Sequence, residues 1–237
     1  AESDPTNDVE GIDAAYKMVI LTQFSFGMSI VPEQVITKGI SGVTLQDIET
    51  AASLGYVIKL LGSSEKVEDG VHVEVGPVLV PKKHPLSTVE NEMNAVFIKS
   101  FGVGESMYYG PGAGSNPTAT SVISDLTTIA KNVQLGVTSL QFNSFEDHTE
   151  FSSDDKVVGK HYFSINVPDE PGVFKKLAEI MLEENVSLEQ IKQESEGNQT
   201  SRIVLITHET NLRDVLAIEE RLKQEPEFTL LSRFRVL

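Results

Sequence analysis

The sequence contains no cysteine, and this absence excludes disulfide bonds, thiolate catalysis and cysteine-ligated metals. A cytoplasmic location is the plain inference. Histidine is present, but no two histidines form an i, i+4 pair or a cluster with the spacing of metal ligands. The five are His72, His84, His148, His161 and His208. We therefore predict no metal site and expect each histidine to be a surface or packing residue.

Long apolar runs are also missing, because none approaches the roughly 20 residues of a membrane-spanning helix. No basic segment followed by an apolar stretch opens the chain, so a secretory signal is not predicted. Positive charge is scarce: 19 Lys and Arg stand against 35 Asp and Glu, a net charge of -16. A basic face for nucleic acid or an anionic membrane is therefore not expected. Any dinucleotide site must supply local positive charge or backbone donors.

The 237 residues suffice for one large or two ordinary domains, and 40% hydrophobic with 23% charged residues is typical of a soluble globular protein. Apolar spacing predicts helices from residue 12 to about 27, from 44 to 55 and over about 117–130. Alternation and apolar runs predict strands at 55–61, 71–81, 94–99 and 104–110. A mostly antiparallel or mixed sheet backed by helices follows.

Residues 134–158 lose this periodicity and gather Ser, Asn, Asp and Glu, which is typical of a linker. From residue 159 the order becomes strand, helix, strand, strand, helix, strand, at 161–167, 171–184, 186–193, 202–208, 211–224 and 228–237. This is the split form of a ferredoxin-like βαββαβ fold. The sequence thus predicts an α+β protein with a first domain at 1–133, a linker, and a small domain at 159–237.

Acidic groups crowd around one lysine near the start of the chain, at a predicted loop-to-helix junction. Asp13 and Lys17 are four residues apart and share a helix face. A lysine flanked by carboxylates can donate and recover a proton, while the carboxylates can hold a cation such as a substrate ammonium. From spacing alone, however, an exposed ion pair worth a few tenths of a kcal/mol is the better interpretation.

The sequence pattern of this stretch resembles the signature of homoserine dehydrogenases. At residues 2–17 it reads Glu-x-Asp-Pro-x-x-Asp-Val-x-Gly-x-Asp-x-x-x-Lys. That family moves a hydride between homoserine and NAD(P), interconverting homoserine and aspartate 4-semialdehyde on the route to threonine, methionine and isoleucine. The resemblance makes Lys17 the proton donor and acceptor at the substrate hydroxyl or carbonyl. It makes Glu2 and Asp13 the groups that bind the amino acid, with Asp8 in the supporting acidic network.

A second candidate site is the run Gly-Pro-Gly-Ala-Gly at residues 110–114, ahead of a predicted helix. Glycines at a helix entrance let backbone N–H groups approach an anion, although a tight turn with Pro117 opening the helix fits the pattern equally well. The run resembles the glycine-rich return segment of homoserine dehydrogenases. The resemblance implies that residues 110–133 return to the nucleotide-binding domain, with Gly114 and then Gly112 touching NADP or NAD.

Residue 1 is alanine rather than methionine, and no Gly-x-Gly-x-x-Gly follows a strand. In the resembled family a nucleotide-binding domain with such a loop precedes the acidic motif. We therefore expect the chain to be the C-terminal part of a homoserine dehydrogenase, without that domain and inactive alone, since hydride transfer requires a fixed dinucleotide. NADP is the expected cofactor, but the residues that discriminate it from NAD lie upstream.

Two turns of the small domain, at residues 169–174 and 185–187, resemble the ACT domain, an amino-acid sensor. The resemblance implies that Gly172 and Asn185 line an effector pocket at a domain interface, with threonine as feedback inhibitor. A plain helix-entry turn at Pro171 and Gly172 is the alternative. Such sensors act in pairs and sheet edges offer pairing surfaces, so a homo-oligomer is expected.

Two further classes of function remain open from the sequence. One is a non-catalytic amino-acid-binding regulator, in which the acidic stretch is a binding cleft and the small domain a sensor. The other is a structural scaffold, which would show no thermal shift with threonine or homoserine. Homoserine-dependent reduction of NAD(P), once a nucleotide-binding segment is supplied, distinguishes the enzyme from both.

Overall fold

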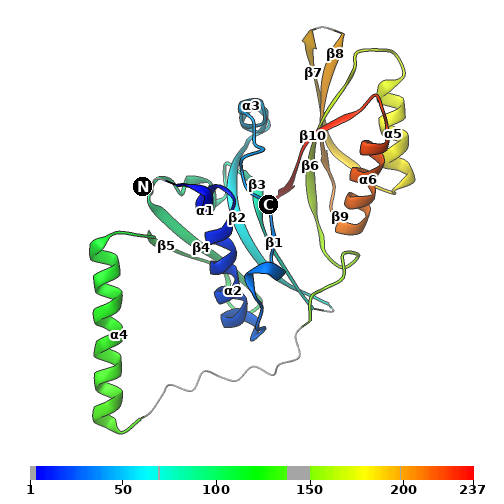
Figure 1. Cartoon of the computed structure of the whole chain (residues 1–237). Helices are drawn as coiled ribbons and strands as arrows, with labels where there is room; N and C mark the ends of the chain where they lie inside the picture. The colour runs from blue at the N-terminus through cyan, green and yellow to red at the C-terminus, as the bar shows by residue number, and fades with distance from the viewer. Residues whose placement is uncertain (1–3, 69, 138–149, 198) are drawn as a thin grey trace. The chain divides into compact units, whose positions relative to one another are not determined.

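The computed structural model describes residues 4–68, 70–137, 150–197 and 199–237 (Figure 1). The chain divides into two compact units, one comprising Ala1–Pro81 with Phe145–Leu237 and the other Lys82–Ser144. The predicted α+β class is confirmed, because both units combine helices with strands.

The first part of the larger unit is a pair of long strands covered by a helix. Its elements are α1 (Thr6–Val9), α2 (Ile12–Phe26), the 3-10 helix η1 (Pro32–Gln34), β1 (Ile36–Thr37), α3 (Leu45–Ser53), β2 (Tyr56–Val67) and β3 (Gly70–Pro81). Strands β2 and β3 pair antiparallel along their whole length. The alternating Val71, Val73 and Val75 of β3 face Ala15 and Met18 of α2 in one core, as period-two patterning predicts.

Helix α3 begins where the sequence indicates, through a capping box. The Thr44 hydroxyl accepts a hydrogen bond from the Asp47 amide at 3.1 Å, and the Asp47 carboxylate accepts one from the Thr44 amide at 3.0 Å. Gly55, at a φ of 90°, follows the helix in the left-handed conformation that glycine adopts without strain.

The second part of the larger unit is the ferredoxin-like fold, and its predicted element order is confirmed. It contains β6 (Val158–Pro168), α5 (Val173–Glu183), β7 (Leu188–Gly197), β8 (Thr200–Thr207), the short extra strand β9 (Thr210–Asn211), α6 (Leu212–Gln224) and β10 (Thr229–Val236). The sheet order is β10-β6-β8-β7, all antiparallel. Helices α5 and α6 cover one face (Figure 1), where Phe163, Leu177, Leu205 and Ile218 are buried in one core.

The two parts of the larger unit share one sheet, which the sequence does not reveal. Strand β10 pairs parallel with β3, placing Arg235 beside Val78 and Val236 beside Leu79. Because β2 also pairs with this stretch of β3, β2 and β10 lie on its opposite edges. The second face of the ferredoxin-like sheet packs on α3, in a core formed by Ala51, Leu79, Tyr162, Val204, Ile206, Phe234 and Val236.

The smaller unit contains a hairpin and a long helix. Its elements are the 3-10 helix η2 (Pro85–Thr88), β4 (Met93–Ser100), β5 (Gly104–Pro111) and α4 (Ser115–Leu135). Strands β4 and β5 form a two-stranded antiparallel sheet, and the ring of His84 contacts Phe97 edge-on at 4.6 Å between centroids. Although α4 is the longest helix in the described ranges, no helix there is long and apolar enough to cross a membrane.

Candidate functional site

The acidic motif folds into a short helix, a left-handed glycine and a longer helix. The Asp4 carboxylate accepts hydrogen bonds from the Thr6 hydroxyl at 2.5 Å and the Thr6 amide at 3.0 Å, and these bonds hold the pKa of Asp4 below its ordinary value. Gly11 then separates α1 from α2 at a φ of 77°. A Cβ there would lie 3.0 Å from Val75, so the motif requires glycine for both conformation and space.

Lys17 and Asp13, predicted to share a face of the helix, form an ion pair. The Lys17 Nζ lies 2.7 Å from the Asp13 carboxylate, and the two side chains are 55% and 48% exposed. The pair is therefore accessible to a ligand. Asp8 is exposed on α1, whereas Glu2 lies outside the described residues.

The helix that carries Lys17 is held against the sheet by close packing. Gly62 of β2 lies under Met18, because a Cβ at Gly62 would come within 2.5 Å of the Met18 Cγ and Sδ. Beyond it, the buried Thr22 hydroxyl donates to the Ser64 hydroxyl at 2.8 Å. These contacts fix the distance of α2 from the sheet and its rotation about its own axis. They therefore also fix the position of the Lys17 backbone.

A neighbouring segment braces the turn ahead of α2. The Ile40 amide donates to the Val9 carbonyl at 2.8 Å, and the Ser41 hydroxyl donates to the Glu10 carboxylate. Gly39 permits this approach, because a Cβ there would lie 2.7 Å from the Glu10 Cα and the Val9 oxygen. The acidic turn is therefore built from two stretches of chain.

The apolar spacing of α2 does not mark its buried face. Ile12, Tyr16, Ile20 and Phe24 are 37% to 56% exposed, while Ala15, Met18 and Thr22 face the sheet. The helix is apolar around much of its circumference, so periodicity alone does not select the side that packs.

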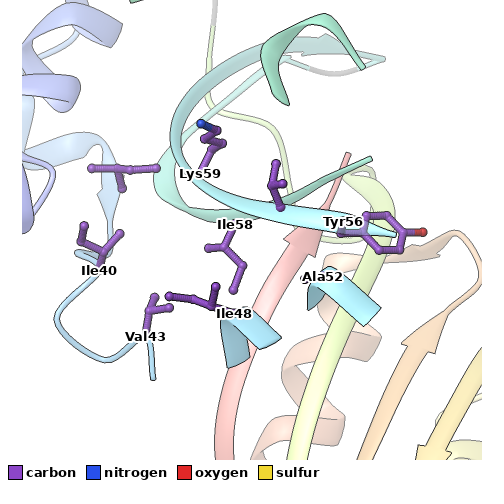
Figure 2. Close-up of a pocket in the computed structure, with 9 residues that line it drawn as sticks. Ile40, Val43, Ile48, Ala52, Tyr56, Ile58 and Lys59 are labelled. Carbon is purple, nitrogen blue, oxygen red and sulfur yellow. The ribbon is translucent and has the colours of Figure 1, made fainter. Parts of the chain in front are cut away.

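A groove of about 370 Å³ lies in the larger unit, and Figure 2 shows Ile40, Val43, Ile48 and Ile58 gathered around it. Its lining residues are Ile40, Val43, Ile48, Ala52, Tyr56, Val57, Ile58, Lys59 and Leu60. The lining includes no carboxylate, so the groove is not part of the acidic site. It is an apolar surface with one lysine at its margin.

The predicted dinucleotide contacts lie in the smaller unit, at the start of α4. Gly114 is the residue before the helix, with φ of 123° and ψ of 156°, a conformation open to glycine. The first turn of α4 carries no acidic side chain, and the first N–H groups of a helix lack partners within it. At Gly112 a Cβ would collide with the Asn94 side chain. The residues present therefore fit an anion such as a pyrophosphate.

The predicted effector residues lie at the two ends of one helix. Gly172, at a φ of 100°, precedes α5, and Asn185, at a φ of 57°, follows it. The loop before the helix is held by a hydrogen bond from the Asp169 amide to the Gln199 carbonyl at 2.8 Å. Eleven helical residues, about 16 Å, separate the two ends, so one copy of the chain does not bring Gly172 and Asn185 together.

Comparison with known proteins identifies the family. The model of the homoserine dehydrogenase family matches residues 1–127. The chain belongs to the homoserine dehydrogenase family. The ACT domain model matches residues 161–227. The homoserine dehydrogenase of Lactococcus lactis is 45% identical over 237 residues, which cover 100% of this chain and 55% of that protein. That of Bacillus subtilis is 44% identical, over 94% of this chain and 52% of that protein.

Solved homoserine dehydrogenases have the same fold. The enzyme from Thiobacillus denitrificans superposes with a TM-score of 0.91 at 32% identity, covering 100% of this chain and 55% of that one. The Staphylococcus aureus enzyme at pH 7.5 gives 0.74 at 33% identity, with 100% and 56% covered. The chain therefore spans about half the length of the homoserine dehydrogenases it matches.

The chain also holds a buried ion pair that sequence reasoning did not single out. Arg202 of β8 lies 2.5 Å from Asp47 of α3, and both side chains are 1% exposed. Arg202 also donates to the Ser164 hydroxyl at 2.6 Å, and the Ser232 hydroxyl donates to Asp47 at 2.8 Å. The sequence does hold a signal for this pair, because Arg202 directly precedes the apolar run at 203–206. A charged residue in a buried strand is rarely without a partner of opposite charge.

A second ionic cluster lies where β3 meets β10. Arg235 pairs with Glu74 at 2.7 Å and with Glu65 at 2.8 Å. Burial favours a raised pKa for Glu74, but the proximity of His72, whose Nε2 lies 3.5 Å from the carboxylate, and the charge of Arg235 outweigh it and bring the pKa to about 2. Burial, reinforced by nearby arginine charges, lowers the pKa of His161 to about 3. No cluster of His, Asp and Glu suited to a metal ion occurs among the residues that the structure describes.

Proposed function

We propose that the chain is part of an NAD(P)-dependent homoserine dehydrogenase that interconverts L-homoserine and L-aspartate 4-semialdehyde. The observation that carries the proposal is the Lys17–Asp13 pair, 2.7 Å apart at the accessible side of a helix that is locked onto the sheet. It lies within the motif of the family to which the chain belongs. The family's route leads to threonine, methionine and isoleucine.

Lys17 takes the proton from the substrate hydroxyl in the oxidation direction and returns it to the carbonyl in the reduction direction. Asp13 and Glu2 hold the substrate ammonium, and Asp8 adds to the negative field around it. Asp13 thus has two tasks, because its carboxylate also fixes the Lys17 amine within the site. When bound, NAD(P) supplies the hydride acceptor or donor.

The proposed contacts with the dinucleotide are backbone groups at the entrance of α4. Gly114 brings the first N–H groups of the helix within reach of a phosphate, and Gly112 supports the same turn. An overall charge of -16 repels phosphates, so such a contact needs local positive charge or backbone donors, and the entrance of α4 offers backbone donors. NADP is the expected cofactor, with NAD to be compared in the same assay.

We propose that the ACT fold binds threonine as a feedback inhibitor. Since Gly172 and Asn185 stand at opposite ends of α5, a pocket that uses both requires Gly172 from one copy and Asn185 from another. This supports a homo-oligomer. We propose that residues 1–133 form the substrate domain, 134–158 the linker and 159–237 the regulatory domain. We also propose that the protein is cytoplasmic.

The homoserine dehydrogenases that match are nearly twice as long as the stretch they share with this chain. We therefore expect that residues beyond this stretch take part in holding the dinucleotide. The 237 residues alone should turn over no homoserine, because hydride transfer needs both reactants fixed in one geometry.

The test uses a chimera in which these 237 residues replace the matching stretch of the Lactococcus lactis enzyme. Homoserine-dependent reduction of NADP or NAD is expected, and Lys17→Gln should lower kcat about 10²- to 10⁴-fold by removing the proton carrier. Lys175→Gln is the matched control, because Lys175 also forms an exposed i, i+4 pair, with Glu179.

A Lys17→Gln chimera that keeps its activity within a few-fold would disprove the role of Lys17. A folded chimera that binds homoserine or threonine without reducing NAD(P) would favour the non-catalytic regulator. Absence of any thermal shift with either amino acid would favour a scaffold.

A further inference from the structure

A continuous series of contacts runs from the loop before α5 to the acidic turn before α2. It begins at Asp169, in the proposed effector loop, whose amide donates to the Gln199 carbonyl at 2.8 Å. Gln199 is held in the left-handed conformation, at a φ of 64°, directly ahead of β8. The position of the loop is thereby tied to the first residues of this strand, among them Arg202.

The next contact is the Asp47 carboxylate, on which four donors converge. Arg202 and Ser232 approach from the ferredoxin-like sheet at 2.5 and 2.8 Å. The Thr44 amide and hydroxyl approach from the start of α3 at 3.0 and 2.8 Å. One buried carboxylate thus caps α3 and anchors its first turn to β8 and β10. A rotation of Arg202 would disturb the helix cap directly.

A short segment leads from this cap to the acidic turn. The Val43 amide donates to the Ile40 carbonyl at 2.9 Å, closing a turn just before Thr44. Ile40 and Ser41 then bond to Val9 and Glu10, the two residues ahead of Gly11. Only Gly42 and Val43 therefore separate Thr44, at the cap of α3, from Ser41, in the brace of the acidic turn.

We propose that Asp47 is a positioning residue, and that the segment 40–47 transmits the state of the ACT sheet to the turn that sets Lys17. The regulatory meaning of this link rests on the proposed function. Packed segments and hydrogen-bond networks of this kind carry coupling between distant sites when both ends bias one element. That element is the first turn of α3, where the Asp47 carboxylate accepts two hydrogen bonds from the ferredoxin-like sheet and two from Thr44.

The remaining contacts between α3 and the sheet provide a comparison. Lys192 donates to the Ser53 hydroxyl at 2.7 Å, at the C-terminal end of α3. This bond also joins α3 to the ferredoxin-like sheet, but it lies off the series that leads through Thr44 to Ile40. Its loss should leave the acidic turn unchanged.

The experiment measures amide hydrogen exchange of the 237-residue chain. Ser41→Ala removes one hydrogen bond at an exposed position, and should raise exchange across residues 6–17 about fivefold, the effect of losing one hydrogen bond. Ser232→Ala should raise exchange over residues 40–44 and again over 6–17. Ser53→Ala is the control and should change neither, while Ser41→Thr, which keeps the hydroxyl, should restore protection.

Thermal midpoints of all variants separate coupling from general destabilisation. A rise in exchange confined to residues 6–17 and 40–44, with an unchanged midpoint for Ser41→Ala, supports the link. Equal exchange in Ser41→Ala, Ser232→Ala and Ser53→Ala would overturn it. If exchange responds as expected but the chimera has no homoserine activity, the proposed function fails while the link stands. An active chimera with unresponsive exchange gives the opposite result.

Discussion

Replacing Asp47 by asparagine removes one charge from the interior while keeping nearly the same shape. The Asp47–Arg202 pair is 1% exposed on both sides, and the asparagine oxygen can still accept from Thr44 at the start of α3. The change therefore keeps the cap of α3 intact but removes the negative charge that pairs with the buried Arg202 guanidinium. Breaking a buried pair from one side costs about 3 to 5 kcal/mol.

Two observations favour a cost of about 3 to 5 kcal/mol in unfolding free energy over a smaller one. The guanidinium is already incompletely satisfied, because the Arg202 Nη1 makes no hydrogen bond to any residue that the structure describes. Asp47 and Arg202 are each only 1% exposed, so bulk solvent compensates little for the lost carboxylate. Against a typical stability of about 5 to 15 kcal/mol, a loss of this size shifts the unfolding midpoint strongly.

Urea unfolding of the chain, analysed by linear extrapolation, measures the free energy of unfolding of Asp47→Asn. Glu179→Gln is the matched control, since Glu179 pairs with Lys175 at 55% and 80% exposure, and it should cost less than about 0.5 kcal/mol. Adding Arg202→Gln to Asp47→Asn should recover part of the loss by removing the unpaired charge. A cost below about 1 kcal/mol for Asp47→Asn alone would refute the reasoning.

Two further changes test the packing of α2 and the response to acid. Gly62→Ala forces a methyl group to within 2.5 Å of Met18 and should cost about 1 to 3 kcal/mol in urea unfolding, whereas Gly42→Ala, with nothing within 4 Å, should be neutral. Below its ordinary pKa of 6.5, His161 binds a proton only in the unfolded chain, so stability should fall by up to roughly 3 kcal/mol between pH 6.5 and 4.5. His161→Gln should flatten the dependence of stability on pH in this range, whereas His208→Gln, at an exposed position, should not. Equal slopes for the two variants would contradict the view that His161 causes the loss of stability.

Much of the fold follows from local patterns. The alternation of Val71, Val73 and Val75 predicts β3, and the capping box of Thr44 and Asp47 predicts the start of α3, because both signals lie within a few residues. The parallel pairing of β3 with β10 does not follow. Its partners are far apart in sequence, and periodicity describes which face a strand buries but not which strand lies beside it.

The candidate site shows the same division. Spacing on one helix predicts the contact between Asp13 and Lys17, and the 2.7 Å ion pair confirms that contact, while the catalytic role remains a prediction. The pairing of Asp47 with Arg202 joins segments that only the tertiary fold brings together. Sequence resemblance grouped Gly172 with Asn185 in one pocket, but the intervening residues form a helix that keeps them apart within one copy.

The sharing of one sheet by β3 and β10 bears on how such a protein can be rearranged. A sensor module attached by a linker alone can be deleted or exchanged without harm to its neighbour. Here, removal of the residues from β6 onward would leave the Val78–Leu79 edge of β3 without its partner and would strip the cover from Ala51. Unpaired strand edges invite aggregation. Exchange of the ACT domain should therefore succeed only when the incoming domain supplies both a terminal strand that pairs with β3 and a basic residue that pairs with Asp47.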